Sequence, residues 1–110
     1  MKSYTDLEQS KKLAEILPLE SADMMHDRLI VIPFNDGSLI PCWSLAALLS
    51  VLPKNLNIGR PSLDSNYMGY YWIQYYDEFM KPNNYKTECF NNPVDACVAM
   101  IEKLHKQNLI

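Results

Sequence analysis

The sequence LIVIPFNDGSLIPCW, residues 29–43, decides the fold class. Two short apolar runs, residues 29–34 and 39–43, stand on either side of Asn35-Asp36-Gly37-Ser38. Asp-Gly between two such runs predicts a β-hairpin, because both central residues of a type I′ turn need a positive φ. Pro33 and Pro41 cannot donate ladder hydrogen bonds, so parts of this hairpin are expected at a sheet edge or a bulge. A hairpin implies antiparallel pairing.

A third strand is predicted at residues 68–76, MGYYWIQYY, because aromatic and β-branched residues fit a pleated, half-buried surface. Alternation divides this strand into two faces, one with Tyr71, Ile73 and Tyr75, the other with Tyr70, Trp72, Gln74 and Tyr76. A turn is expected over residues 77–85, and residues 86–90 are expected to pair back as the next strand.

Capping signals predict three helices, at residues 5–17, 44–52 and 92–107. Thr5 followed by Glu8 matches a capping box, and Ser44 suits the N-cap of the second helix. Asn92 before Pro93 is typical of an N-cap followed by the first helical position.

The predicted order is α-β-β-α-β-β-α, with a loop over residues 54–66. This order indicates an α+β fold, in which three helices pack on an antiparallel sheet of about four strands. A length of 110 residues suits one domain, and we expect a single domain over residues 1–110.

The composition is that of a folded globular protein, with 48% hydrophobic residues and a formal net charge of −3. The lysines and arginines form no basic stripe, which argues against a nucleic-acid partner. The longest apolar runs, residues 29–34 and 45–52, fall short of the roughly 20 residues needed to span a membrane, so no membrane partner is expected.

The cysteines indicate reduced thiols, because Cys42, Cys89 and Cys97 have neither metal-ligand nor C-x-x-C spacing. The N-terminus shows no apolar secretory signal, and a cytoplasmic protein is expected. Neither a phosphate-binding loop nor a metal-ligand pattern occurs, so the sequence predicts no cofactor and no metal.

Three segments occur in this order: YTDLEQSKKLA at residues 4–14, IPCWSLAALL at residues 40–49 and NPVDACVAMI at residues 92–101. Together they are similar to a set of short proteins of gut anaerobic bacteria and their phages and mobile elements. The resemblance implies no known activity and no catalytic residue. It suggests a phage or mobile-element context.

The leading functional hypothesis is a small protein-interaction module. Tyr70, Trp72 and Tyr76 are its candidate interface, because tyrosine and tryptophan provide large contact area at little entropic cost. The partner would be another protein or a second copy of the chain. The competing structural interpretation is that this face is covered and belongs to the core.

The alternative is a small enzyme or small-molecule binder, in which Cys42, His26 and the loop of residues 54–66 line a pocket. A reactive thiol at Cys42 would need a nearby base such as His26 and a lowered pKa. The more common role of a free cysteine is that of a small buried apolar side chain, which suits Cys42 and Cys97 equally well. A structural accessory protein of a phage or mobile element is a third hypothesis.

Overall fold

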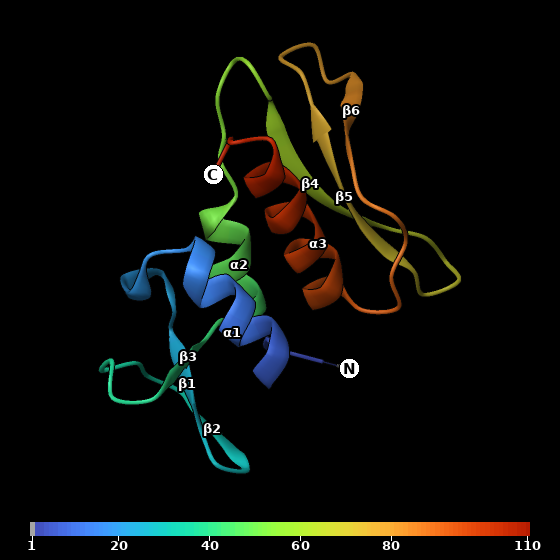
Figure 1. Cartoon of the computed structure of the whole chain (residues 1–110). Helices are drawn as coiled ribbons and strands as arrows, with labels where there is room; N and C mark the ends of the chain where they lie inside the picture. The colour runs from blue at the N-terminus through green and yellow to red at the C-terminus, as the bar shows by residue number, and fades with distance from the viewer. Residues whose placement is uncertain (1) are drawn as a thin grey trace.

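A computed structural model describes residues 2–110, and in this range three α-helices and two three-stranded antiparallel sheets confirm the predicted α+β class (Figure 1). The strands form two sheets, ordered β2-β1-β3 and β4-β5-β6, where the sequence predicted about four strands in one sheet. The elements are α1 (Leu7–Ile16), the 3₁₀ helix η1 (Leu19–Ser21), β1 (Met24–Asp27), β2 (Ile30–Ile32), β3 (Ile40–Cys42), α2 (Leu45–Val51), β4 (Arg60–Ser65), β5 (Tyr71–Tyr76), β6 (Pro82–Lys86) and α3 (Pro93–Lys106).

The predicted Asp-Gly hairpin is wrong in its pairing, since β2 and β3 both pair with β1 and not with each other. Between them, the Gly37 N–H donates to Asn35 Oδ1 at 3.1 Å and the Ser38 N–H donates to Asp36 Oδ1 at 2.9 Å. Such side-chain bonds give the backbone an alternative to a two-residue turn. The tight hairpin instead joins β1 to β2, with Arg28 at φ 57°.

The larger sheet corrects two further boundaries. Half of the predicted loop of residues 54–66 is the edge strand β4, where Pro61 can lack an N–H without cost. The return strand β6 begins before the predicted residues 86–90, because Asp77 Oδ1 accepts hydrogen bonds from the N–H groups of Phe79 and Lys81 and closes a short turn. Phe90 makes only an isolated bridge.

The first helix begins one residue later than the capping pattern predicted. Asp6 is its N-cap, with the Gln9 N–H donating to Asp6 Oδ1 at 2.8 Å and the Asp6 N–H donating to Gln9 Oε1 at 3.1 Å. Thr5 is buried instead, and its hydroxyl oxygen accepts a hydrogen bond from the Trp43 N–H. The predicted caps Ser44 and Asn92 are confirmed for α2 and α3.

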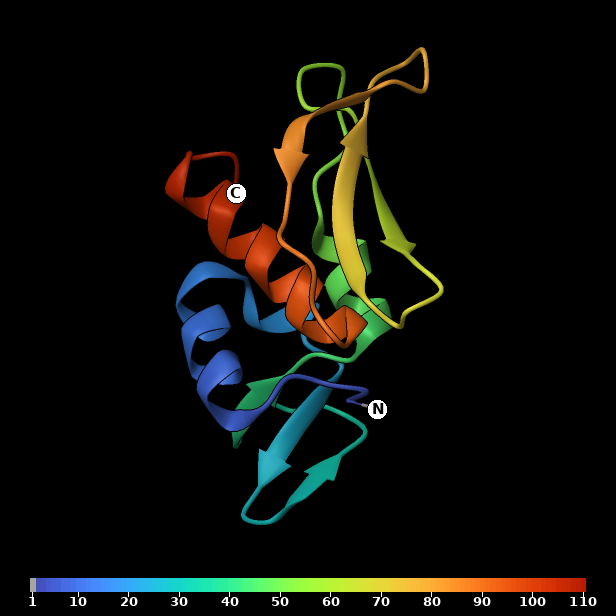
Figure 2. The ribbon, with the colours of Figure 1, turned by 90° about the vertical axis from the view of Figure 1, so that its right-hand side faces the viewer.

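The hydrophobic core surrounds α3, which contacts α1 and α2 on one side and β5 on the other (Figures 1 and 2). Its buried residues repeat at helical spacing, as the sequence predicted: Val94, Cys97, Val98, Ile101 and Leu104. The small sheet β2-β1-β3 projects from the opposite end of the molecule to the β5–β6 turn (Figure 2). This arrangement leaves the outer face of β4-β5-β6 at the surface.

Candidate functional site

The aromatic strand β5 has one buried and one open face. Ile73 and Tyr75 are fully buried on the face that α3 covers. Trp72 and Tyr76 lie on the other face and are half-buried, and no helix of residues 2–110 packs over it (Figures 1 and 2). The sheet β4-β5-β6 is therefore covered by α3 on one face only. Its other face, with Trp72 and Tyr76, is at the surface.

Polar side chains hold the two rings of the open face in place. Asp64 pairs with Trp72 across the strands and accepts hydrogen bonds from the hydroxyls of Tyr76, at 2.7 Å, and Ser62, at 2.6 Å. The hydrogen bond to Asp64 raises the pKa of Tyr76. Lys86 Nζ lies 5.6 Å from the centroid of the Trp72 ring, at cation–π distance. Both rings are thus pre-oriented.

Gln74, between the two rings, is buried although it lies on the open face. Its Nε2 donates to the carbonyl oxygens of Tyr75 at 2.8 Å and Asn83 at 2.9 Å, where the pairing of β5 with β6 shifts register. The Gln74 amide fills the bulge and bonds backbone carbonyls of β5 and β6, so its role is to stabilise the sheet. The burial of Gln74 is therefore local to the bulge, and Trp72 and Tyr76 on either side of it stay half-buried.

Tyr70 stands apart from the other two candidate residues. It lies in the turn before β5, where Asn66 Oδ1 accepts hydrogen bonds from the N–H groups of Tyr70 and Met68. Tyr70 is 43% exposed, and Tyr67 in the same turn is 98% exposed. The structure therefore groups Trp72 with Tyr76 and places Tyr70 at the end of the β4–β5 turn, where its carbonyl accepts from the Asn66 N–H at 3.1 Å.

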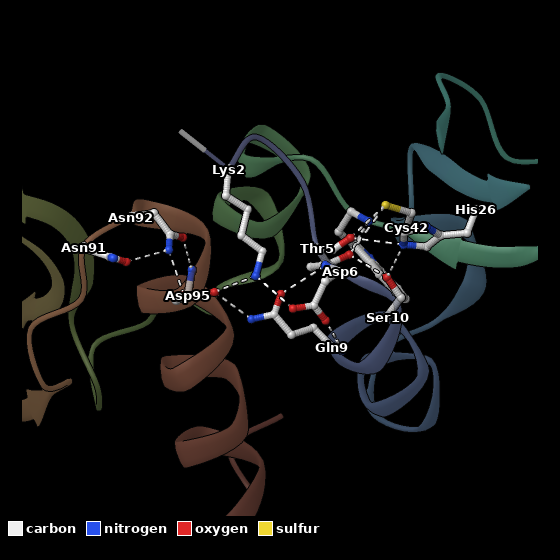
Figure 3. A network of polar contacts seen from close by, with 11 residues as sticks. Lys2, Thr5, Asp6, Gln9, Ser10, His26, Cys42, Asn91, Asn92 and Asp95 are labelled. Atoms are coloured by element: carbon white, nitrogen blue, oxygen red, sulfur yellow. Dashed lines mark hydrogen bonds and ion pairs between the residues drawn. The ribbon is translucent and has the colours of Figure 1, made fainter. Parts of the chain in front are cut away.

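The other candidate pair, Cys42 and His26, meets in one polar network through Thr5 and Ser10 (Figure 3). His26 Nε2 lies 3.1 Å from both the Thr5 carbonyl oxygen and Ser10 Oγ. A carbonyl oxygen only accepts, so Nε2 carries a proton and donates. This nitrogen is therefore not a base toward Ser10.

The Thr5 hydroxyl has a single proton, and this proton determines the direction of its hydrogen bond with Ser10. Ser10 Oγ and Thr5 Oγ1 are 2.8 Å apart, and the Thr5 hydroxyl donates to Cys42 Sγ at 3.6 Å, so the Ser10 hydroxyl is the donor to Thr5. The Cys42 thiol donates to the Thr5 carbonyl at 3.4 Å. Thr5 joins the N-terminal segment to β3, since its Oγ1 also accepts from the Trp43 N–H at 3.1 Å.

Cys42 is fully buried, and burial raises the pKa of its thiol. The neutral thiol is therefore favoured, which is the opposite of what a nucleophilic cysteine needs. The part of the predicted loop that remains a loop, residues 54–59, lies at the other end of the molecule from β1 and β3 (Figure 1). The structure does not bring this loop to Cys42 and His26.

A second network ties the N-terminal segment to α3 (Figure 3). Asp95 Oδ1 accepts from Lys2 Nζ at 2.9 Å and from Gln9 Nε2 at 2.8 Å, and Lys2 also pairs with Asp6 at 3.0 Å. Partial burial opposes ionisation of Asp95, but hydrogen bonds from Lys2, Asn92 and Gln9 outweigh it and lower its pKa. The network fixes the segment from Lys2 to Gln9 against the first turn of α3.

Sequence reasoning missed a set of large apolar side chains that are exposed at turns. They comprise Leu29, Ile30, Phe34 and Leu39 around β2, Leu56 before β4, Tyr67 and Met68 after β4, and Phe79 and Met80 after β5. The available signal was the position of these residues beside turn-forming Asn, Asp and Gly residues, where apolar side chains are unexpected.

A surface groove of about 320 Å³ lies between α1 and α3 and contains none of the candidate residues. It is lined by Lys12, Glu15, Ile16, Glu102, His105 and Lys106. Among residues 2–110, no cluster of three or more His, Cys, Asp or Glu side chains is placed to hold a metal ion. No helix in the described part of the chain is long and apolar enough to cross a membrane.

Fold and site together define a small α+β protein with an uncovered aromatic sheet face. Comparison of the chain with protein-family models, curated proteins and solved structures finds no match in any of the three. The functional argument therefore rests on the geometry described above.

Proposed function

We propose that this protein is an interaction module that binds a protein partner through the outer face of β4-β5-β6. The observation that carries the proposal is the pair of pre-oriented, half-buried rings of Trp72 and Tyr76 on a sheet face that no helix covers. Tryptophan and tyrosine are the residues most enriched among binding hot spots. The charged rim of Asp64 and Lys86 suits the polar surround of such a contact.

The charges beside the rings favour a protein over a nucleic acid. A base-stacking platform combines aromatic rings with a positive groove that follows the phosphates. Here a carboxylate, Asp64, bonds Tyr76 directly, and the chain carries a net charge of −3. Both features oppose a polyanionic ligand.

The test is a comparison of captured proteins between matched variants of the immobilised full chain. Trp72→Ala with Tyr76→Ala removes the rings, and Phe79→Ala removes an apolar side chain that is 73% exposed outside this face. We expect a specific partner to be retained by wild type and Phe79→Ala and lost at least about tenfold from the double variant. Equal melting temperatures show that folding is preserved. Identical retention by all three chains would contradict the proposal.

The alternative of a small enzyme at Cys42 and His26 has less support, because the thiol is buried and His26 Nε2 donates. It predicts that Cys42 is alkylated faster in the folded chain than in a denatured control. Slower reaction in the folded chain would exclude a nucleophilic role for this cysteine.

Two parts of the proposal concern where the protein works. A reducing, cytoplasmic location is supported by the free thiols of Cys42, Cys89 and Cys97. The mobile-element context expected from the resemblance is tested by the genes that flank the coding sequence. Neighbouring phage structural genes would favour the third hypothesis, an accessory structural protein, over an interaction module.

A further inference from the structure

We propose that two copies of this chain form a two-fold symmetric dimer by pairing the open edge of β2 with β2 of the second copy. The small sheet β2-β1-β3 has two edges, and only one is occupied. The β3 edge is covered by α1, and directly after the strand Tyr4 bridges to Ser44 and the Thr5 N–H donates to the Trp43 carbonyl at 2.9 Å. At β2, no strand of residues 2–110 pairs with the outer edge, which lies at the rim of the molecule (Figure 2).

The β1–β2 hairpin determines which backbone groups this edge presents. Asp27 and Ile30 close a two-residue turn and form the first cross-strand pair. Such a closing pair is hydrogen-bonded, so the next residue, Val31, directs its N–H and C=O away from β1. These unpaired groups form a template for one more antiparallel strand.

The edge is complementary to itself. Antiparallel pairing centred on Val31 gives two reciprocal hydrogen bonds between the two Val31 residues and places Ile30 opposite Ile32 of the second copy. The same register sets Arg28 opposite Phe34 of the second copy, so these positions place no like charges opposite each other. Pro33 has no N–H and ends the ladder, which limits the pairing to this short segment.

The apolar surface around β2 matches what a modest dimer needs. Leu29 is 101% exposed, Ile30 62%, Phe34 55% and Leu39 39%. Together these side chains present ~500 Å² per copy, so a two-fold contact would bury up to ~1,000 Å², the lower limit of specific interfaces. A two-fold pairing uses the single open edge of each copy and closes, so assembly stops at two chains.

The test measures the mass of the full chain in solution by light scattering on a sizing column. We expect wild type at ~100 μM to approach twice the monomer mass of 12.7 kDa. Ile30→Lys places a charge at the edge and should weaken the dimer at least about tenfold. Leu56→Lys is the matched control, since Leu56 is 90% exposed and lies away from the small sheet, and it should remain dimeric. A monomeric wild type, or an Ile30→Lys chain that dimerises as wild type does, would overturn the proposal.

A cross-link provides a second test that tolerates a weakened dimer. Val31→Cys, made together with Cys89→Ser to remove the exposed native thiol, should form a disulfide between two chains under mild oxidation. Absence of the cross-linked dimer at ~100 μM chain would contradict the register proposed here. The Trp72→Ala and Tyr76→Ala variants should dimerise normally, so failure of this proposal and failure of the proposed function are distinguishable.

Discussion

Thr5→Val tests whether the buried hydroxyl of Thr5 joins the N-terminal segment to β3. Valine preserves the shape of threonine and removes only hydrogen bonding. In the structure Thr5 is fully buried, and its Oγ1 accepts from the Trp43 N–H at 3.1 Å and shares a hydrogen bond with Ser10 Oγ at 2.8 Å. The variant leaves the Trp43 N–H without this acceptor in a dry environment.

The expected cost follows from these lost contacts. A buried donor left without a partner costs about 1–3 kcal/mol. The fully buried Ser10 hydroxyl also loses its acceptor, although it still accepts from His26 Nε2, so the cost does not fall at the low end of this range. We therefore expect Thr5→Val to lower the free energy of unfolding by about 2 kcal/mol and the melting temperature by about 10 °C in a chain of this size.

Urea unfolding followed by circular dichroism measures this loss, with an unchanged slope showing that only stability has altered. Thr5→Ser is the matched control, because it keeps the hydroxyl and removes one methyl group, at a cost of about 1 kcal/mol. A Thr5→Val chain within about 0.5 kcal/mol of wild type, or a Thr5→Ser chain that is equally destabilised, would refute the role of the hydroxyl.

Three further predictions follow from the structure. Gly59→Ala should destabilise the fold by more than about 2 kcal/mol, since a Cβ there meets a backbone carbonyl of β5, whereas Gly69→Ala, with the same positive φ and open space, should cost about 1 kcal/mol in thermal unfolding. Burial raises the pKa of Cys97 to about 12, so at pH 8 an alkylating agent should modify the exposed Cys89 first, and mass spectrometry of the native chain checks this order. The pKa of Asp95 is lower in the folded chain than the ordinary value of 3.8, so its stabilisation is present above about pH 4 and lost as the pH falls further; Asp95→Asn should therefore be less stable than wild type at pH 7 and nearly equal to it near pH 2 in urea titrations.

The local pattern identified helices better than strands. The caps Ser44 and Asn92 and the buried stripe of α3 were predictable, because capping and helical periodicity are properties of neighbouring residues. Thr5 shows the limit of this reasoning. Thr5 and Asp6 both suit an N-cap, and only the tertiary contact with Trp43 explains why Asp6 caps the helix while Thr5 is buried.

Of the two candidate sites, one was predictable from the local sequence and the other depends on tertiary contacts. Alternation placed Trp72 and Tyr76 on one strand face, and the structure shows both there. The network joining His26 to Cys42 could not be predicted, because it connects α1, β1 and β3 through Thr5. The donor role of His26 Nε2 depends on a carbonyl from a segment about twenty positions earlier in the chain.

The sequence by itself determined the α+β class, the three helices and the aromatic character of β5, because these depend on periodicity and on residues close together in the chain. Only the tertiary structure decided strand pairing. Side-chain hydrogen bonds in residues 35–38 replace the predicted two-residue turn, and β2 and β3 do not pair with each other. Both pair with β1, which lies between them. Pairing depends on which partner a strand meets in space, so the open face of β5 and the open edge of β2 become visible only in the folded chain.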